Sequence, residues 1–465
     1  MPLNRRSFFI RLFQFAGLAE AALYSLRAAN AGATGAARNS EIINVRAWGA
    51  LGNGVADDTA AIQASINASS LVYLPPGCYK CTTALVLKKS NFKMYGEGEL
   101  CFEYDFVGGG ITIAAHVDNI ELNGFAIRLQ SNLKDMGFCG IYSIPNEASV
   151  VASRFYNLKI HGAAFGINIG GRQVAELISG IAGKGFKSAG SRFMPYMESS
   201  LDGRNIIQGN VIQNSLFSKR IGKGGAHGIY VRGSGYNVIS QNQIVNMQGG
   251  ILAASEGAVA NNIILNCFED NGIYCAGSVG LSVHANFIEN TKADGIAFNH
   301  AENCSAIGNQ VTGAGNASFR IQESHGIVIS ANVCNSKGVS GSYVRSFSDK
   351  GSPDAPHNIL IENNLFAGGI VKGNAFAFGM LPIGAAYKNW RISGNQIVGV
   401  NSSSLSESFF GPHAIVMFAA HKENSNLIVE NNTFSEITRC MNGPLHCQLI
   451  KNATRESGND FEYSE

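Results

Sequence analysis

The sequence has few charged residues and almost no excess of either sign. Only 15% of its 465 residues are Asp, Glu, Lys or Arg, and the formal net charge is +2. The total charge therefore gives no argument for a nucleic-acid partner held by a general positive field. Beyond the N-terminal segment, no stretch resembles a membrane span, which needs about 20 predominantly apolar residues.

Metal-binding motifs are also scarce. The 10 cysteines show no metal-like grouping, because Cys78 and Cys81 lack a second pair and nearby histidines. We therefore expect both to be small core residues on strands. No dense carboxylate run typical of a calcium loop is present, so we assign no metal ligands. Cys440 and Cys447 flank a predicted turn, and export would allow them to form a disulfide.

The N-terminal segment, residues 1–31, has the features of an export signal. It contains Arg5 and Arg6 followed by Ser-Phe-Phe, then a mildly apolar stretch, and it ends in small residues around Ala29 and Ala31. The stretch is too charged for a good membrane-spanning helix. The segment resembles a bacterial twin-arginine signal peptide. This resemblance implies folding before export, a periplasmic or secreted location, and no membrane attachment once the signal is removed.

Asparagine and glycine dominate the rest of the chain, and the asparagines follow a repeat. Asparagines at one position of this repeat are each followed by a short segment that contains apolar residues: Asn210, Asn242, Asn262, Asn286, Asn309, Asn332, Asn364, Asn395 and Asn432. Their spacings are 32, 20, 24, 23, 23, 32, 31 and 37 residues. The central values cluster near one length, so the longer ones indicate the same repeat with inserted loops.

A second motif alternates with the first. Segments containing Gly-Ile begin at His227, Gly249, Asn271 and Asp294, each between two asparagine motifs. Each repeat should therefore hold two or three short strands joined by tight turns, in which glycine adopts positive backbone angles. This predicts an all-β fold, a right-handed single-stranded parallel β-helix. The isoleucines would stack inward, and the asparagines would form ladders between coils.

Asp57 and Asp58 are the only adjacent aspartates in the chain. Paired carboxylates can cleave glycosidic bonds, but these two stand directly before a predicted short helix with Ile62 and Ile66 on one face. Aspartate is a preferred residue at a helix N-terminus. We therefore expect the pair to start a short capping helix that covers the open end of the β-helix, and not to act in catalysis.

Residues 43–98 resemble the N-terminal module of the pectate lyase superfamily. The matching segments are INVRAWGALGNGVADDTAAIQASI, LVYLPPGCYK and NFKMYGEGEL, and later repeats resemble the coils of the same superfamily. We expect one β-helix domain over residues 42–450 and a polar, frayed tail over 451–465. The resemblance implies polysaccharide as the partner. It leaves calcium open as a cofactor, and it leaves open a monomer or the homotrimer of tailspike-like relatives.

The resemblance does not fix the reaction, because the superfamily hosts several chemistries. In the segment equivalent to the epimerase acid/base motif, Phe165, Asn168 and Gly170 replace the expected tyrosine, aspartate and histidine. Asparagine cannot transfer a proton usefully near neutral pH. The first hypothesis is a lyase acting on a uronic-acid-containing polysaccharide. The alternatives are a glycoside hydrolase, an epimerase, and a non-catalytic carbohydrate-binding or cell-envelope structural protein.

The candidate site lies on the repeats between residues 227 and 325. β-Elimination needs a group that neutralises a carboxylate, a base and an acid, and these roles suit Arg, His and Tyr. Alternation along strands places residues beside the inward isoleucines on one outward face. The predicted catalytic residues are Tyr230, Arg232, His227 and Asp294. The predicted substrate-binding residues are Tyr274, Asn299, His300, Arg320 and Glu323.

Overall fold

The computed structural model describes residues 41–103, 108–129, 138–144, 148–170, 203–216, 226–337, 342–348, 355–369, 378–380, 386–399, 414–418, 421–438 and 448–464. The chain divides into two units, Met1–Glu41 and Ile42–Glu465, and the second contains the fold. The predicted signal segment and the Cys440–Cys447 pair lie outside the described residues. Within the described part, no helix combines the length and apolar character needed to cross a bilayer.

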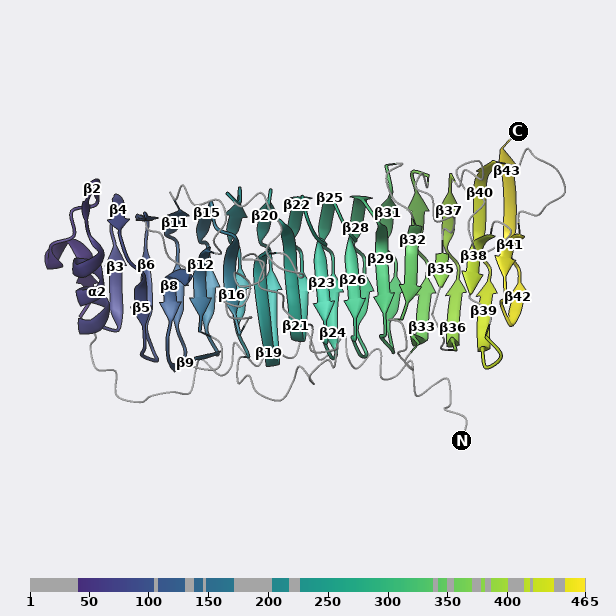
Figure 1. The fold of residues 1–465 in the computed structure, drawn as a ribbon, viewed down its shortest axis with the longest axis horizontal. Coiled ribbons are helices and arrows are strands. Elements are labelled where there is room, and N and C mark those ends of the chain that lie inside the picture. Colours follow the sequence, from purple (N-terminus) through teal and green to yellow (C-terminus); the bar gives the residue numbers. More distant parts are fainter. Residues whose placement is uncertain are drawn as a thin grey trace, which may run out of the picture. The chain divides into compact units, whose positions relative to one another are not determined.

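Most coils of the described domain consist of three short strands that pair in parallel with the next coil, and in β19 and β21 two of these strands are continuous. A typical coil contains β24 (Leu281–His284), β25 (Phe287–Thr291) and β26 (Ile296–Asn299). They pair with the corresponding strands of the next coil, β27 (Ser305–Ile307), β28 (Gln310–Ala314) and β29 (Ala317–Gln322). Figure 1 shows these strands in stacked rows. The predicted parallel β-helix is therefore confirmed.

Large apolar side chains fill the interior of the coils. One inward position is occupied on successive coils by residues that share the same register: Ile167, Ile229, Ile251, Ile273, Ile296, Phe319 and Val344. All of them are buried. Removing such a side chain from water stabilises the fold by roughly 1.5–3 kcal/mol. The stacked isoleucines predicted from the Gly-Ile motif are thus confirmed as a core column.

The predicted asparagine ladder is confirmed as a continuous chain of side-chain amides. The backbone N–H and Nδ2 of Asn286 both donate to Oδ1 of Asn309 on the next coil, at 3.0 and 2.9 Å. Nδ2 of Asn286 also donates to the Val259 carbonyl at 2.9 Å. Each ladder asparagine follows a residue that turns the chain sharply, such as Gly308 with a φ of 65°. The ladder thereby satisfies buried polar groups at one corner of every coil.

The C-terminal segment corrects one sequence prediction, because it is not a frayed tail. Residues 455–464 form β42 (Arg455–Ser457) and β43 (Asp460–Ser464), which add to the preceding coil. Asn459 extends the ladder by accepting from the Asn432 backbone and side chain, both at 3.0 Å. Phe461 stacks on Phe434 with ring centroids 5.0 Å apart. These two anchors order a segment whose composition alone looked polar.

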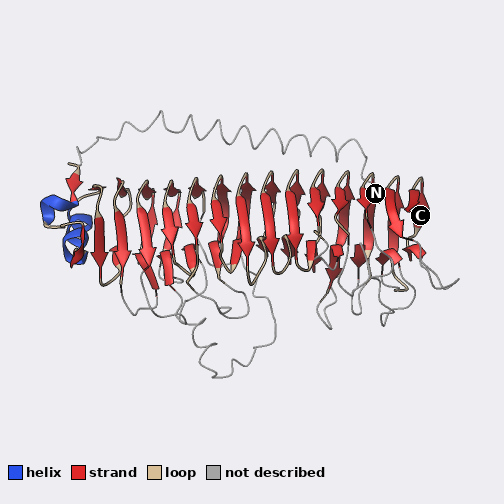
Figure 2. Cartoon of the chain, turned by 90° about the horizontal axis from the view of Figure 1, so that it is seen from above, coloured by secondary structure: helices blue, strands red, loops and turns tan. Residues whose placement is uncertain are grey.

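The helix α2 (Thr59–Ala68) lies at the N-terminal end of the coils, as Figures 1 and 2 show. Its residues Ile62 and Ile66 are buried, which confirms the predicted capping helix. Asp58 is the residue at the helix start, but its oxygens accept from the backbone of Leu51 at 2.7 Å and Gly52 at 3.0 Å. The side chain of Asp58 therefore ties down the preceding loop, and not the helix.

Asp57 is the aspartate that bonds to the helix. Its Oδ1 accepts from the Thr59 backbone N–H at 3.0 Å and from the Thr59 hydroxyl, and its Oδ2 accepts from the Thr82 hydroxyl at 2.6 Å. Partial burial opposes ionisation, but the hydrogen bonds from Thr59 and Thr82 outweigh it and lower the pKa of Asp57 below its ordinary 3.8. Both aspartates thus have structural roles, in agreement with the sequence.

The lowered pKa of Asp57 leads to a test by pH. Because the pKa of Asp57 is lower in the folded than in the unfolded protein, its carboxylate contributes to the free energy of unfolding. This contribution is fully present above the pKa of an unfolded aspartate, about 3.9, and is lost as pH falls through the pKa of the folded state. We expect Asp57→Asn to lower the melting temperature by a constant amount above about pH 4 and by less below it. Thermal melts of both proteins across this range provide the measurement. A difference that grows on acidification would contradict the assignment.

The cysteines correct a second prediction. Cys78, at the start of β4 (Cys78–Cys81), is not a core residue, because it forms a disulfide with Cys101 on β7 (Glu99–Phe102). Cys81 is buried as a free thiol, as predicted. Strand alternation explains the difference, since Cys78 points outward and Cys81 inward. The separation of 23 residues between the bonded cysteines matches one coil, which is the signal that the sequence reading missed.

Candidate functional site

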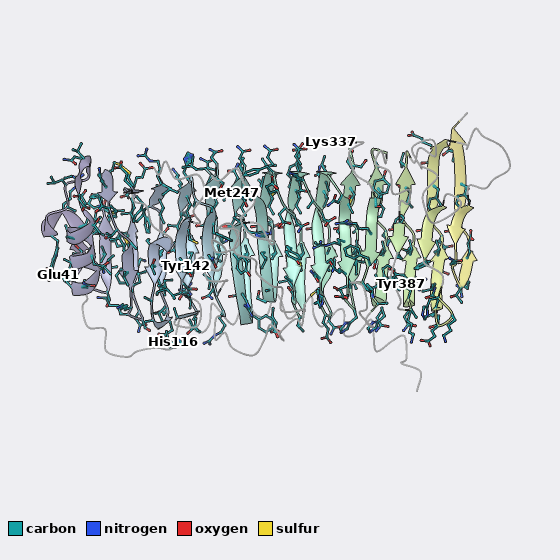
Figure 3. The ribbon with its side chains drawn as sticks, in the orientation of Figure 1. Glu41, His116, Tyr142, Met247, Lys337 and Tyr387 are labelled. Carbon is teal, nitrogen blue, oxygen red and sulfur yellow. A yellow bond between two sulfur atoms is a disulfide. The ribbon has the colours of Figure 1, made fainter. Side chains whose placement is uncertain are left out.

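The candidate site lies on the outward side of one row of strands, which we call the front face. The strands of this row are β12 (Phe138–Ser143), β16 (Phe165–Ile169), β19 (His227–Ser240), β21 (Gly249–Ala260), β23 (Ile273–Ala276), β26, β29 and β32 (Ser342–Phe347). One outward register position along the row holds Tyr142, Asn168, Tyr230, Leu252, Tyr274, Ala297, Arg320 and Arg345. Figure 3 shows the side chains of the domain, with Tyr142 labelled. Tyr230 and Tyr274 are thus two coils apart on one face, as predicted.

A chain of polar contacts connects four predicted substrate-binding residues on the front face. Nδ2 of Asn299 donates to the Tyr274 hydroxyl oxygen at 2.6 Å. Oδ1 of Asn299 lies 2.5 Å from Nδ1 of His300. Nε2 of His300 lies 2.7 Å from Oε2 of Glu323, whose side chain is only 4% exposed, whereas the imidazole is 27% exposed. The network therefore presents a partly exposed histidine held by a buried carboxylate.

Two arginines flank this network and share one carboxylate. Arg345 donates from Nε and Nη2 to the two oxygens of Asp294, at 2.9 and 2.8 Å. Nε of Arg320 lies 3.5 Å from Oδ2 of Asp294. The Arg320 guanidinium also lies 5.2 Å from the centre of the Tyr274 ring. Asp294, whose side chain is fully buried, therefore holds both cations, and it places Arg320 beside the tyrosine.

The role of Asp294 leads to a prediction for Asp294→Asn. Removing one partner of a buried ion pair leaves the other charges uncompensated, so we expect a loss of about 2–3 kcal/mol of stability, reduced by the partial exposure of the arginines. Urea denaturation of the variant measures the loss. Asp118→Asn, at an exposed aspartate, is the matched control. A variant as stable as the control would show that Asp294 does not hold the arginines.

The backbone at His300 and Glu323 has an unusual conformation. Both residues have positive φ angles, 52° and 46°, directly after the last residues of β26 and β29. Most other non-glycine residues of the described chain with positive φ are asparagines, which adopt this conformation at low cost. Energetically unfavourable backbone angles at bulkier residues are often found at functional sites. The conformation brings the imidazole and the carboxylate together across adjacent coils.

The four residues predicted to be catalytic do not form one cluster, because three lie on β19 and Asp294 lies on a later coil, paired with Arg345. His227 and Asp294 were expected to be accessible, but both are fully buried. His227 packs edge-on against Tyr230, with ring centroids 6.3 Å apart. Leu252 lies between Tyr230 and Tyr274 in the register, and Arg232 lies opposite Ala254. The geometry therefore moves the candidate site from the predicted catalytic set to the predicted binding set.

Arg345 is the member of the site that the sequence reading missed. It lies beyond residue 325, where the predicted site ended, and it pairs with Arg320 in the register of β29 and β32. Val344 points inward and Arg345 outward, as alternation along a strand requires. Aligning SFRIQ with SYVRSF, one coil later, would have found it. Arg320 and Arg345 are 25 residues apart, whereas Ala297 and Arg320 are 23 apart, so a fixed repeat length does not align the two arginines.

Asn168 occupies the outward column two coils before Leu252. Its side chain is buried, Nδ2 contacts Sγ of Cys139 at 3.8 Å, and Oδ1 has no hydrogen-bond partner. An amide in this setting supplies no acid or base, which agrees with the reading that the epimerase motif is absent here. Among the described residues, the one group of side chains close enough to share a metal ion is Cys78, Glu99 and Cys101. That group lies on β4 and β7, outside the front face.

The coil architecture and its front-face cluster define a right-handed parallel β-helix protein. The family model described as right handed beta helix region matches residues 110–334 and 227–378. The chain therefore belongs to the right-handed β-helix family. Residues 42–114 match the model described as rhamnogalacturonase A/epimerase, pectate lyase-like. The predicted membership of the pectate lyase superfamily is thus confirmed.

Solved structures are similar to this chain at low sequence identity. Yersinia enterocolitica family 28 exopolygalacturonase aligns with a TM-score of 0.51 and 12% identity over 90% of this chain and 79% of that chain. The A-module of Azotobacter vinelandii mannuronan C-5 epimerase AlgE4 aligns with a TM-score of 0.48 and 17% identity over 81% of this chain and 100% of that chain. The Streptococcus pneumoniae surface adhesin PfbA gives 0.46 and 12%, over 85% and 90%. A search of curated proteins found no match.

Proposed function

We propose that the protein is a lyase that cleaves a uronic-acid-containing polysaccharide by β-elimination at the front-face cluster. The observation that carries the proposal is the placement of Tyr274 and His300 on either side of Asn299, beside the guanidinium of Arg320. A proton donor and a proton acceptor are thus separated by a single amide. The cation next to them suits the carboxylate of a uronate.

The reaction assigns one role to each group. Arg320 binds the uronate carboxylate and neutralises it, which makes the proton on the adjacent carbon, C5, easier to remove. Tyr274 and His300 are the acid/base pair: one removes the C5 proton and the other protonates the departing C4 oxygen. A C4–C5 double bond forms as the C5–H and C4–O bonds break. Glu323 and Asp294 are positioning residues, since they act through His300 and the arginines.

Asn299 couples the protonation states of the two proton-transfer groups. As placed, both nitrogens of His300 face oxygen atoms, an arrangement that a doubly protonated ring would satisfy. With the Asn299 amide turned by 180°, Tyr274 would donate to Oδ1 while Nδ2 donates to a neutral imidazole. The same three residues can therefore hold the site before and after a proton is transferred. An aliphatic residue at position 299 would remove this coupling.

Assays with purified protein and a panel of uronate polymers test the proposal. Ultraviolet absorbance detects the double bond of an elimination product, and a reducing-end assay detects every cleavage. Absorbance that rises with reducing ends supports the lyase. Reducing ends alone would identify a hydrolase and would overturn the proposal. The twin-arginine-like segment supports a further part of it, that the enzyme acts in the periplasm or outside the cell.

A non-catalytic carbohydrate-binding protein is the second candidate. The observation that favours it is that both carboxylates of the cluster are already paired, Asp294 with arginines and Glu323 with His300. The cations and the Tyr274 ring would then hold a polymer without cutting it. Retention on immobilised polymer with no product by either assay would select this candidate. The same pairing disfavours a hydrolase, which needs two carboxyl groups placed across the scissile bond.

A further inference from the structure

A second cluster of polar and sulfur-containing side chains lies near the N-terminal end of the coils. It surrounds the disulfide between Cys78 and Cys101. The two cysteines belong to β4 and β7, which are neighbours in the sheet. Cys101 is almost completely buried, whereas Cys78 is partly exposed. The two sulfurs of this disulfide therefore differ in their access to solvent.

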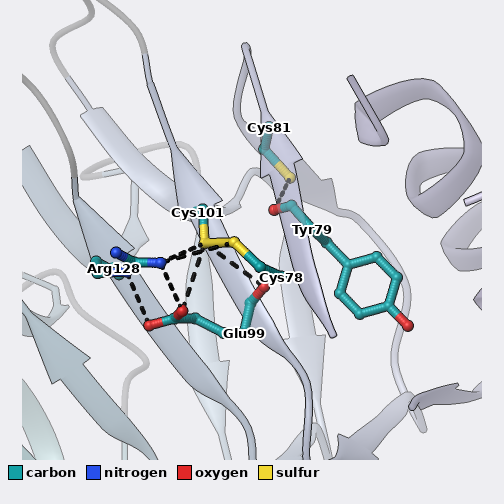
Figure 4. A network of polar contacts seen from close by, with 6 residues as sticks. All are labelled: Cys78, Tyr79, Cys81, Glu99, Cys101 and Arg128. Carbon is teal, nitrogen blue, oxygen red and sulfur yellow. Dashed lines mark hydrogen bonds and ion pairs between the residues drawn. A yellow bond between two sulfur atoms is a disulfide. The ribbon is translucent and has the colours of Figure 1, made fainter. Parts of the chain in front are cut away.

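An ion pair lies beside the disulfide, as Figure 4 shows. Arg128, on β11 (Ala126–Leu129), lies opposite Cys101 in the register. Its Nη2 is 3.3 Å from Sγ of Cys101 and 3.6 Å from Sγ of Cys78. The same guanidinium donates to both oxygens of Glu99, at 2.9 and 2.7 Å. A cation thus contacts both sulfurs, and a carboxylate competes for it.

We propose that this disulfide is a thiol-exchange site that reacts with dithiols, and that it is not an inert staple. The observation behind the proposal is that a guanidinium lies where a thiolate would form, which stabilises the leaving group of exchange. A disulfide whose reduced form is stabilised in this way is a stronger oxidant. The proposal is independent of the reaction on the front face.

The exchange has two balanced steps. A thiolate of the dithiol attacks the accessible sulfur of Cys78, and Cys101 leaves as a thiolate beside Arg128. The second thiolate of the dithiol then attacks the mixed disulfide, and Cys78 leaves. The dithiol is oxidised to its disulfide by two electrons, and the protein gains two thiolates, which take up protons from water according to pH. The first two coils next to α2 are then no longer cross-linked.

The same atoms do not favour a metal ion. Sγ of Cys78, Sγ of Cys101 and a Glu99 oxygen lie close enough together to share one. However, the guanidinium of Arg128 already contacts all three groups. A divalent cation would have to displace this positive charge from its carboxylate. The arrangement instead suits an anionic thiolate, which is the product of exchange.

Reduction of the purified protein by dithiothreitol, with alkylation of the thiols and peptide mapping, tests the proposal. We expect Arg128→Gln to slow reduction at least fivefold. It should also lower the equilibrium constant for reduction about tenfold, a shift of about 30 mV. Glu99→Gln should change both quantities in the opposite direction, because it releases the guanidinium from its competing carboxylate. Arg154→Gln, at an arginine of another row of strands, is the control and should change neither.

Several outcomes would overturn the proposal. One is an Arg128→Gln protein with wild-type rate and equilibrium constants. Another is a parallel change in the Arg128 and Glu99 variants, which would mean that both residues act only through packing. A third is a disulfide that reacts only at denaturant concentrations that unfold the domain. Circular dichroism of each variant confirms folding before the rates are compared, and mapping to Cys78 and Cys101 excludes label on other cysteines.

Discussion

Replacing Tyr274 with phenylalanine is expected to slow elimination of the uronate polymer by about 10²–10⁴-fold, the usual contribution of a positioned acid or base. The change removes only the hydroxyl that contacts Asn299, and it keeps the ring beneath Arg320. Binding should therefore persist while turnover falls. Initial rates from ultraviolet absorbance, measured at saturating and limiting polymer, separate kcat from KM.

Tyr230→Phe provides the matched comparison for this experiment. Tyr230 occupies the same outward column as Tyr274, two coils earlier, but it packs on His227 and lies outside the network. The sequence alone favoured Tyr230 as catalytic, whereas the geometry favours Tyr274. A large loss with Tyr230→Phe and none with Tyr274→Phe would reverse this assignment and overturn the site.

Replacing Asn309 with alanine should cause the largest loss of stability, about 3–5 kcal/mol, because it removes four buried hydrogen bonds and takes away the acceptor of the Asn286 backbone N–H. Asn309 accepts from the backbone and the side chain of Asn286 and donates to Asn332 and to the Val283 carbonyl. These asparagines are enclosed between coils, so water does not replace the lost partners. Urea denaturation followed by circular dichroism measures the loss.

Asn266→Ala is the control for this experiment, because it removes a ladder asparagine that is exposed and not buried. Asn266 belongs to an exposed ladder, in which it donates to Asn246 at 3.1 Å and accepts from Asn290 at 3.1 Å. Its φ of 58° disfavours alanine, so we expect a cost of about 1–2 kcal/mol from the backbone alone. An equal or smaller loss at Asn309 would mean that the inner ladder does not stabilise the coils.

The sequence predicted the fold well because the β-helix repeats its physical constraints on every coil. One buried amide and one inward isoleucine recur at matching positions, so periodicity reveals both. The C-terminal coil was harder to recognise. Its composition is polar, so the anchoring roles of Asn459 and Phe461 were not recognised. Each of these residues stabilises the coil only through a partner on the preceding coil. The Cys78–Cys101 disulfide was missed for the same reason.

The site was predicted in part. Alternation placed Tyr274 on the outward face, and the motifs FNHAEN and FRIQESH supplied Asn299, His300 and Arg320. The sequence could not show that Asp294 is enclosed by two arginines, because that depends on side-chain reach across two coils. It also could not rank Tyr230 below Tyr274. Residue type and position were the same, and only their neighbours differ.

The inner asparagine ladder has a consequence for how this scaffold can change. Consecutive ladder asparagines are between 20 and 37 residues apart in the chain. Even so, each backbone N–H from Asn210 to Asn395 donates to Oδ1 of the next ladder asparagine over a distance of only 2.8–3.0 Å. The turn that holds the ladder asparagine therefore fixes the register of each coil, whatever the length of the loops in that coil. Segments between strands can be lengthened, shortened or exchanged without moving the coils. Natural or engineered changes in these segments can therefore alter what the protein recognises, while the stack of coils stays the same.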